Sequence, residues 1–379
     1  MARTSVWSAA GFLLLLSPLG VHAHTFGHGQ IPLYDSAIDV SGSKFRGLST
    51  YANLPYVHCL SAGKDNEVEQ YDIAILGAPF DTSTTGRPGA RFGPAGIRRG
   101  SQRIQNGYSV YTGENTLDSW AKIVDCGDVP MIFLDNTVAL KQLGEGHRVG
   151  DPSTVNLFKF TNIARLSQAV PRPIHQKDMC QESLHLGETI PPPYQLYDLP
   201  MNIGERYTWD PEVLGGGFSH YAGVNHGTFL HIAHEEGLIL NSSVHAGIRA
   251  PVMNKKKDMR NDRRCGFAVI TARDIDKIGA QGIIDSIKNR VGENRVYISV
   301  DIDVLDPAFA PATGTSEPGG WSTRELLTIF DGLTGLKVIG ADVVEVAPAY
   351  DNTGETTVLA AAEVAFSLLT LMVQTPVTD

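Results

Sequence analysis

The sequence predicts an α/β fold in which a mainly parallel sheet has helices on both faces. Short apolar runs with strand character alternate along the chain with longer amphipathic segments, which is the order found in β-α-β units. The 379 residues are 42% hydrophobic and 19% charged, a composition typical of a folded globular chain with a sizeable core. One domain is expected, because no internal repeat or long linker divides the chain.

The expected elements can be placed in chain order from hydrophobic periodicity and from Gly and Pro. The first strand is expected at 71–77. A Gly- and Pro-rich loop follows it and leads into a helix that starts near Pro94 and Ile97. Further strands are expected at 123–126, 244–248, 296–300 and 337–340, and further helices at 280–290, 323–333 and 357–371.

Residues 1–23 have the pattern of a secretory signal peptide: Arg3 precedes an apolar run, and small residues stand at the cleavage position. The mature chain is expected to start at His24. A membrane anchor is the alternative, but the run is too short to span a bilayer. We therefore expect a secreted, extracellular protein with no membrane association after signal removal. Asn241-Ser242-Ser243 is a glycosylation sequon that fits this route.

Charge and cysteine content limit the remaining functions. The net charge of -10 disfavours a nucleic-acid surface and is compatible with a small cationic substrate. The cysteines at 59, 126, 180 and 265 are too scattered for a disulfide scaffold or a zinc site, so at most one disulfide is expected, of open pairing. The Lys255-Lys256-Lys257 run predicts an exposed loop without a function.

The stretch 299–307 carries the strongest chemical signal. Asp301 and Asp303 alternate with apolar residues, so a strand would place both carboxylates on one face. Such acids at the carboxyl end of a buried strand lie where open α/β sheets place their sites, and hard divalent cations prefer these oxygens. Two solvated aspartates are the alternative. We predict that Asp301 and Asp303 bind metal.

The sequence around this stretch resembles the ureohydrolases, the arginase and agmatinase family. The resemblance is carried by residues 307–320 and is supported upstream by 77–81 and 88–94 and downstream by 343–351. Glu345 followed by Ala-Pro-Ala-Tyr-Asp is closer to the agmatinase branch. The resemblance covers most of the chain outside residues 144–208.

This resemblance implies a three-layer α/β/α fold of the arginase/deacetylase type, with residues 24–379 as a single ureohydrolase-like domain. It also implies two Mn2+ ions held by six ligands, of which Asp301 and Asp303 match two. The implied partner is a small cationic guanidine substrate, and a homo-oligomer is compatible with the family.

Two further residues match functional positions of the family. His226 stands in Asn225-His226-Gly227-Thr228, which resembles the family's His-Gly-Thr loop, and is our candidate for the proton shuttle. Imidazole suits that task near neutral pH. Glu345 is our candidate for binding the guanidinium cation. The alternatives are a structural loop histidine and an ordinary salt-bridge partner.

Residues 144–208 depart from the family pattern. The family's Gly-Gly-Asp-His turn and its later Asp-x-His-x-Asp motif, which supply the other four metal ligands, have no counterpart there. The segment lacks a helical or strand period and contains Pro191-Pro192-Pro193. It reads either as a disordered insertion or as an aberrant segment that disrupts the fold. His175 and His185 are not assigned as ligands.

The genetic code offers an explanation for this departure. Permitted codons for Glu182 to Pro193, read one base earlier, encode Arg-Ile-Leu-Thr-Leu-Gly-Gly-Asp-His-Thr-Thr-Thr. Codon degeneracy leaves the first base of each shifted triplet open, while the residues present fix the other two. The shifted reading contains the missing strand and first metal motif. A frameshift, alternative splicing or a misplaced intron would account for it.

The sequence thus predicts an agmatinase-like, manganese-dependent hydrolase that converts a linear guanidine compound to urea and an amine. Arginase or guanidinobutyrase activity is the alternative within the enzyme class. The alternative from another class is a catalytically inactive splice or gene-model variant that lacks four of six metal ligands.

Overall fold

The computed structural model describes residues 48–60, 71–82, 84, 86–104, 107–149, 156–161, 199–203, 226–235, 237–252 and 255–377. All of them belong to one compact unit, Phe45–Asp379.

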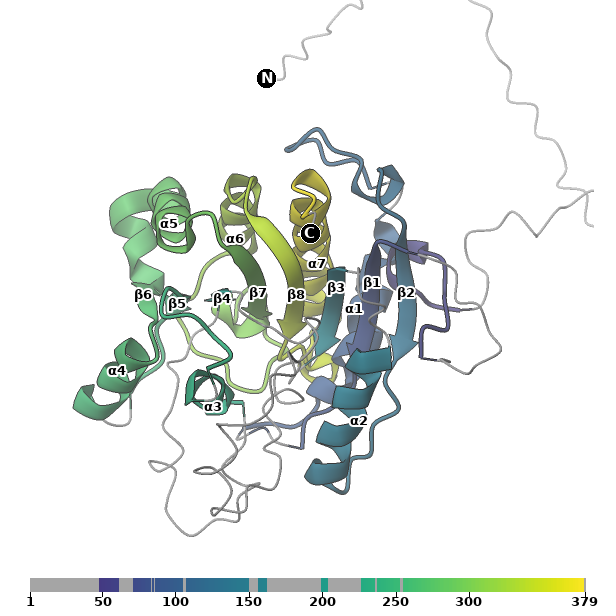
Figure 1. Ribbon diagram of the computed structural model, residues 1–379, viewed down its shortest axis with the longest axis horizontal. Helices are drawn as coiled ribbons and strands as arrows, with labels where there is room; N and C mark the ends of the chain where they lie inside the picture. Colours follow the sequence, from purple (N-terminus) through teal and green to yellow (C-terminus); the bar gives the residue numbers. More distant parts are fainter. Residues whose placement is uncertain are drawn as a thin grey trace, which may run out of the picture. The chain divides into compact units, whose positions relative to one another are not determined.

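A central sheet of eight strands organises this unit (Figure 1). The strand order is β2-β1-β3-β8-β7-β4-β5-β6, and every neighbouring pair is parallel. The strands are β1 (Ile73–Ala78), β2 (Ile123–Asp128), β3 (Asn156–Thr161), β4 (Leu199–Ile203), β5 (Val244–Ile248), β6 (Ala268–Thr271), β7 (Arg295–Asp301) and β8 (Lys337–Val344).

Helices cover both faces of the sheet and give the unit three layers. One face packs against α1 (Gly93–Gly100), α5 (Ile275–Val291), α6 (Thr323–Gly332) and α7 (Thr356–Gln374). The other packs against α2 (Asn136–Val149) and α3 (Phe229–Glu235), and α4 (Lys255–Arg264) lies beside α3. This arrangement explains why all six residues of β1 are buried: parallel strands with helices on both sides have no solvent face.

The predicted fold class is confirmed, and so are several element positions. The strand at 244–248 and the start of the helix at Thr323 agree with the structure. A capping box explains that start, because Ser322 Oγ accepts from Glu325 N and the Glu325 carboxylate accepts from Ser322 N. The prediction of a loop at Lys255–Lys257 is wrong, since α4 begins at Lys255. Lysine has a good helix propensity, so a basic run can also be a helical face.

The expectation that residues 144–208 disrupt the sheet is also wrong for the described part of the chain. Both β3 and β4 come from this segment, and they complete the sheet between β1 and β8 and between β7 and β5. The reason is physical: an empty central position would leave the backbone N–H and C=O groups of both neighbouring strands without partners.

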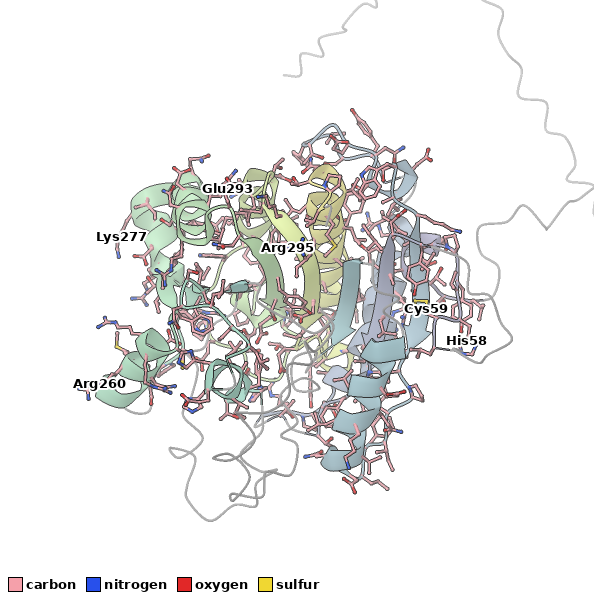
Figure 2. The ribbon with its side chains drawn as sticks, in the orientation of Figure 1. His58, Cys59, Arg260, Lys277, Glu293 and Arg295 are labelled. Carbon is pink, nitrogen blue, oxygen red and sulfur yellow. A yellow bond between two sulfur atoms is a disulfide. The ribbon has the colours of Figure 1, made fainter. Side chains whose placement is uncertain are left out.

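Cys59 and Cys126 form a disulfide, visible at the edge of the sheet in Figure 2. The segment just before Cys59 runs along β2, because Val57 N donates to Asp125 O at 3.0 Å and Asp125 N donates to Pro55 O at 3.0 Å. The disulfide therefore fastens a short stretch of chain over the edge strand. The pairing that the sequence left open is thus Cys59 with Cys126, and Cys265 is buried outside this disulfide.

By length and composition alone, α7 could span a membrane. However, 72% of its most apolar window is buried inside the molecule. The helix packs against α1, α6 and β8, and its apolar residues belong to the main core cluster. We therefore assign α7 as a core helix.

Candidate functional site

The candidate site lies at the carboxyl ends of β7 and β8, near the middle of the sheet. Asp301 is the last residue of β7 and pairs in register with Val344, the last residue of β8. Glu345 follows Val344 directly, so the sheet brings Asp301 and Glu345 side by side. The strand cores behind them are fully buried at Ile298 and Val300, which fixes both strand ends.

Asp303 reaches the same site through a turn and not through a longer strand. The expected alternation stops at Asp301, because Ile302–Val304 form one 3-10 turn. The Asp301 carboxylate stabilises this turn by accepting from Asp303 N at 3.1 Å. Thr315 Oγ1 donates to Asp303 Oδ2 at 3.0 Å. Asp303 Oδ1 is buried and accepts no hydrogen bond in the described part of the chain.

The burial of Asp303, which is 1% exposed, excludes the alternative of two solvated aspartates. Burial raises the pKa of Asp301 well above its usual value, and the nearby carboxylates of Asp303 and Glu345 raise it further. Burial also raises the pKa of Asp303, and Glu345 adds to that increase, although Arg249 opposes it. Three acids thus gather where ionisation is costly. A cation would stabilise this cluster.

Glu345 is held in a backbone conformation that few residues adopt. Its φ is +62°, in the left-handed region that costs a non-glycine residue about 1–3 kcal/mol. This strained residue is 2% exposed, and its Oε1 lies 3.2 Å from His226 Nδ1. His226 stands in the turn just before α3, with a side chain 10% exposed. The structure therefore brings both predicted catalytic residues together.

A half-buried arginine, Arg249, was not singled out in the sequence and contacts the backbone next to Asp303. Arg249 directly follows β5, and its guanidinium donates to Asp303 O, Val304 O and Glu317 O. It therefore ties the turn that carries Asp303 to the loop at Glu317. Its position was the signal available in the sequence. Arg249 follows a buried strand, just as Asp301 ends one and Glu345 follows one.

The loop at 81–92 packs against the segment that carries Thr315, on the side of the site away from Arg249. Asp81 is 1% exposed and accepts from Gly89 N at 2.6 Å, from Arg91 N at 3.2 Å and from the Arg91 guanidinium. This loop packs closely on the chain that carries Thr315, because a Cβ on Gly86 would lie 2.9 Å from Gly314 O. Asp81 therefore supports the Thr315 hydroxyl that orients Asp303.

The described residues fit a divalent cation only in part. Asp301 and Asp303 supply carboxylate oxygens of the kind that a hard cation prefers, and the buried Oδ1 of Asp303 has no hydrogen-bond partner among the described residues. Within the described ranges, however, no group of three or more His, Cys, Asp or Glu is arranged to hold a metal. The two aspartates could therefore supply only part of a ligand set, and the described residues do not complete it.

Other residues considered from the sequence lie elsewhere. His231 and His234 are on α3, and His231 Nδ1 lies 3.2 Å from Asn261 Oδ1. Asp306 accepts from the backbone N–H groups of Ala308, Gly319 and Gly320, so it fixes the conformation of the loop beside the site. Cys180, His175, His185 and His220 lie outside the described residues.

Comparisons with known proteins agree with this geometry. The Arginase family pattern matches residues 71–149 and 208–370, more than half of the chain. The unmatched stretch 150–207 lies inside the segment that departed from the family in the sequence. It contains both β3 and β4.

Three relatives illustrate the similarity. The chain is 46% identical over 339 residues to putative agmatinase 1 of Schizosaccharomyces pombe, covering 88% of this chain and 84% of that protein. It superposes on the structure of proclavaminate amidino hydrolase from Streptomyces clavuligerus with a TM-score of 0.68 at 28% identity, covering 88% and 99% of the two chains. A Trypanosoma cruzi formiminoglutamase structure with Mn2+ shares the fold, with a TM-score of 0.62 at 18% identity over 84% and 99%. The chain therefore belongs to the arginase family, and it is an amidinohydrolase at the level of that family.

Proposed function

We propose that this protein hydrolyses a linear guanidine compound to urea and an amine, and that it uses manganese. The observation that carries the proposal is the contact between His226 and Glu345 at 3.2 Å, beside Asp301 and the buried Asp303. This arrangement places a cation-binding carboxylate, a titratable imidazole and metal-type oxygens within one site.

Glu345 has the role of holding the substrate. A guanidinium cation donates from several N–H groups in a plane, and a carboxylate accepts from it in a charge-assisted contact. Because Glu345 is buried and strained in place, little freedom is lost when the substrate binds. The substrate carbon is thereby held next to Asp301 and Asp303.

His226 has the role of moving a proton. When water adds to the guanidinium carbon and the bond to the alkyl nitrogen breaks, that nitrogen must gain a proton to leave as an amine. The imidazole of His226 can donate it, and its contact with Glu345 orients the ring.

Asp301 and Asp303 would hold manganese, with Thr315 fixing the orientation of Asp303. When bound, the metal pair would supply an activated water and positive charge at the reacting carbon. The family relation supports two ions with four further ligands, which none of the described residues provides.

The test is urea release from agmatine with added manganese, compared with arginine and 4-guanidinobutyrate. We expect the highest kcat/KM for agmatine. His226→Ala should lower kcat by about 10²–10⁴-fold with bound manganese unchanged, whereas Asp303→Ala should lose both metal and activity. His58→Ala, at an exposed histidine away from the site, is the control and should match the parent. Full activity of His226→Ala would contradict the assigned role.

A second candidate function applies to the chain in which residues 150–207 have the given sequence. In that case we propose that the protein is a non-catalytic product. Two observations favour it besides the unmatched segment. Pro200 is in β4, which has a neighbour on each side, although proline lacks the N–H that an interior strand donates. Lys159 is in β3, which is also interior, where parallel strands are usually apolar throughout.

The two candidates are separated by comparing the written chain with a repaired one. The repaired chain carries the one-base-earlier reading through residues 175–207 and the codons missing before Thr208, as read from the transcript. We expect elemental analysis to find two manganese ions in the repaired chain and little in the written one. Equal metal content and equal urea release would show that the written segment is native. Peptide mass spectrometry across residues 150–207 of the natural protein gives an independent answer.

We also propose that the protein is secreted. The signal-like sequence at residues 1–23 is one support, and the Cys59–Cys126 disulfide is another, because disulfides persist mainly in oxidising compartments.

A further inference from the structure

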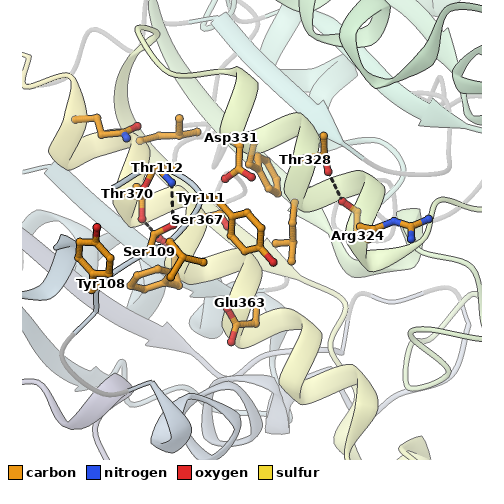
Figure 3. Close-up of a pocket in the computed structure, with 16 residues that line it drawn as sticks. Tyr108, Ser109, Tyr111, Thr112, Arg324, Thr328, Asp331, Glu363, Ser367 and Thr370 are labelled. Atoms are coloured by element: carbon orange, nitrogen blue, oxygen red, sulfur yellow. Dashed lines mark hydrogen bonds between the residues drawn. The ribbon is translucent and has the colours of Figure 1, made fainter. Parts of the chain in front are cut away.

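A pocket of about 570 Å³ lies between α6, α7 and the loop that carries Tyr108 and Thr112 (Figure 3). This size is within the range of small-molecule sites. The pocket is separate from the candidate active site. Trp321, two residues before α6 begins, bridges to Leu305 beside that site, and α6 runs from there toward the opposite end of the sheet, where the strands begin. At that opposite end, Thr334 Oγ1 lies 3.0 Å from Gln374 Oε1, three residues before β8 begins.

The pocket walls combine apolar and aromatic surface. Leu327 and Phe330 contribute from α6 and Phe366 from α7, while the loop contributes Tyr108 and Tyr111. Both tyrosines are unusually open, at 62% and 85% exposed. Exposed aromatic rings beside a pocket favour a ligand with an apolar body, and their faces attract cations.

Two carboxyl groups line the pocket without a close cationic partner. Asp331 comes from the last turn of α6 and Glu363 from α7, and neither forms an ion pair in the described part of the chain. Arg324 is the single basic residue among the described lining residues. Figure 3 shows it away from both acids. The pocket therefore carries an excess of negative charge.

The surroundings make the ionised form of Asp331 costly. This residue is half-buried, burial raises its pKa, and its place in the last turn adds the unfavourable negative end of the helix dipole. Glu363 is more exposed; partial burial raises its pKa, and the charge of Arg103 opposes the change. In addition, Thr112 Oγ1 lines the same pocket as a buried oxygen with no hydrogen-bond partner within the described ranges.

We propose that this pocket binds an organic cation with an apolar body, such as an arylalkylamine. The ammonium group pairs with the Asp331 carboxylate and donates to the Thr112 hydroxyl, and the apolar body packs against the tyrosine and phenylalanine rings. An anion of the same shape is repelled by Asp331, and a neutral molecule leaves this acid unpaired. This inference does not rest on the proposed hydrolysis.

The test compares three probes that share one ring system and differ in charge: tryptamine, tryptophol and indole-3-acetate. Binding is measured by isothermal titration calorimetry on the full chain at pH 7.5. We expect tryptamine to bind at least tenfold more tightly than tryptophol, and indole-3-acetate to show no binding. Equal affinity for all three probes, or no saturable binding of tryptamine up to millimolar concentration, would overturn the proposal.

Variants locate the binding in this pocket. Asp331→Asn should weaken tryptamine at least fivefold, and Ser367→Phe, which fills the pocket without a change of charge, should abolish binding. Asp276→Asn, at an exposed helical aspartate outside the pocket, is the matched control and should leave the affinity unchanged. If Asp331→Asn and Ser367→Phe both keep the parent affinity with an unchanged melting temperature, tryptamine binds elsewhere and the proposal fails.

Discussion

Asp81 illustrates how one buried residue can organise a loop and make stability depend on pH. Its carboxylate accepts from Gly89 N and from the backbone and side chain of Arg91. Burial alone would raise the pKa of Asp81, but these hydrogen bonds and the Arg91 charge lower it below 3.8. A depressed folded pKa gives stability that is complete above the unfolded pKa and is lost as pH falls through the folded pKa.

We therefore expect Asp81→Asn to lower the free energy of unfolding by about 2–3 kcal/mol at pH 7, because charged hydrogen bonds are lost. The difference from the parent should shrink as the pH falls below about 4, the ordinary pKa of an aspartate, because the folded pKa lies lower. Urea unfolding at several pH values measures it. Asp276→Asn, an exposed aspartate, is the control. A difference that stays constant down to pH 2 would contradict the assigned ionisation.

Glu345 allows a test of whether the site stores backbone strain. Glycine relieves the cost of a φ of +62°, whereas alanine removes the same side-chain functional groups and keeps the strain. Glu345→Gly should therefore be more stable than Glu345→Ala by about 1 kcal/mol, with both variants inactive. Chemical denaturation of the two variants gives this difference directly, and equal stabilities would argue against strain.

The disulfide is the covalent link between a loop and an edge strand. Cys59 and Cys126 are 67 residues apart in sequence, so the crosslink restricts a long loop in the unfolded chain. We expect the Cys59→Ser/Cys126→Ser double variant to lose about 2–4 kcal/mol of stability. Thermal unfolding with and without reductant should show the same loss in the parent but none in the variant. Cys265→Ser, at a buried thiol outside the bridge, is the control.

Elements with a clear pattern could be predicted from the sequence, and the others could not. The apolar stretch of β5 and the capping box of α6 are local signals that the structure preserves. The four-residue β6 is too short for a reliable period. The interior strands β3 and β4 are determined by their neighbours, since β4 takes its register from β7 and β5. The local sequence of such a segment does not indicate a strand, because its pairing arises from the position between two neighbouring strands that must be filled.

At the scale of the whole molecule, the candidate site could also be predicted only in part from the sequence. Asp301 and Asp303 stood out as acids alternating with apolar residues, and His226 and Glu345 stood out through the resemblance to the family's motifs. Their convergence depends on strand order, which places the end of β7 beside the end of β8. Arg249 acts through backbone groups that are remote in sequence, so only the folded chain reveals its role.

The last prediction concerns secretion of the whole chain. If it enters a secretory pathway, three marks should occur together in a eukaryotic expression host: an N-terminus at His24, an oxidised Cys59–Cys126 pair and a glycan on Asn241. Asn241 is exposed in the turn just before β5, so an oligosaccharide there displaces no core contact. Intact mass, thiol alkylation and glycosidase treatment of protein from the medium measure the three marks. Asn241→Gln should remove the glycosidase-sensitive mass and leave the other two unchanged. A chain that retains Met1, carries free thiols at Cys59 and Cys126 and stays inside the cell would contradict secretion, while the sheet and the candidate site would still hold.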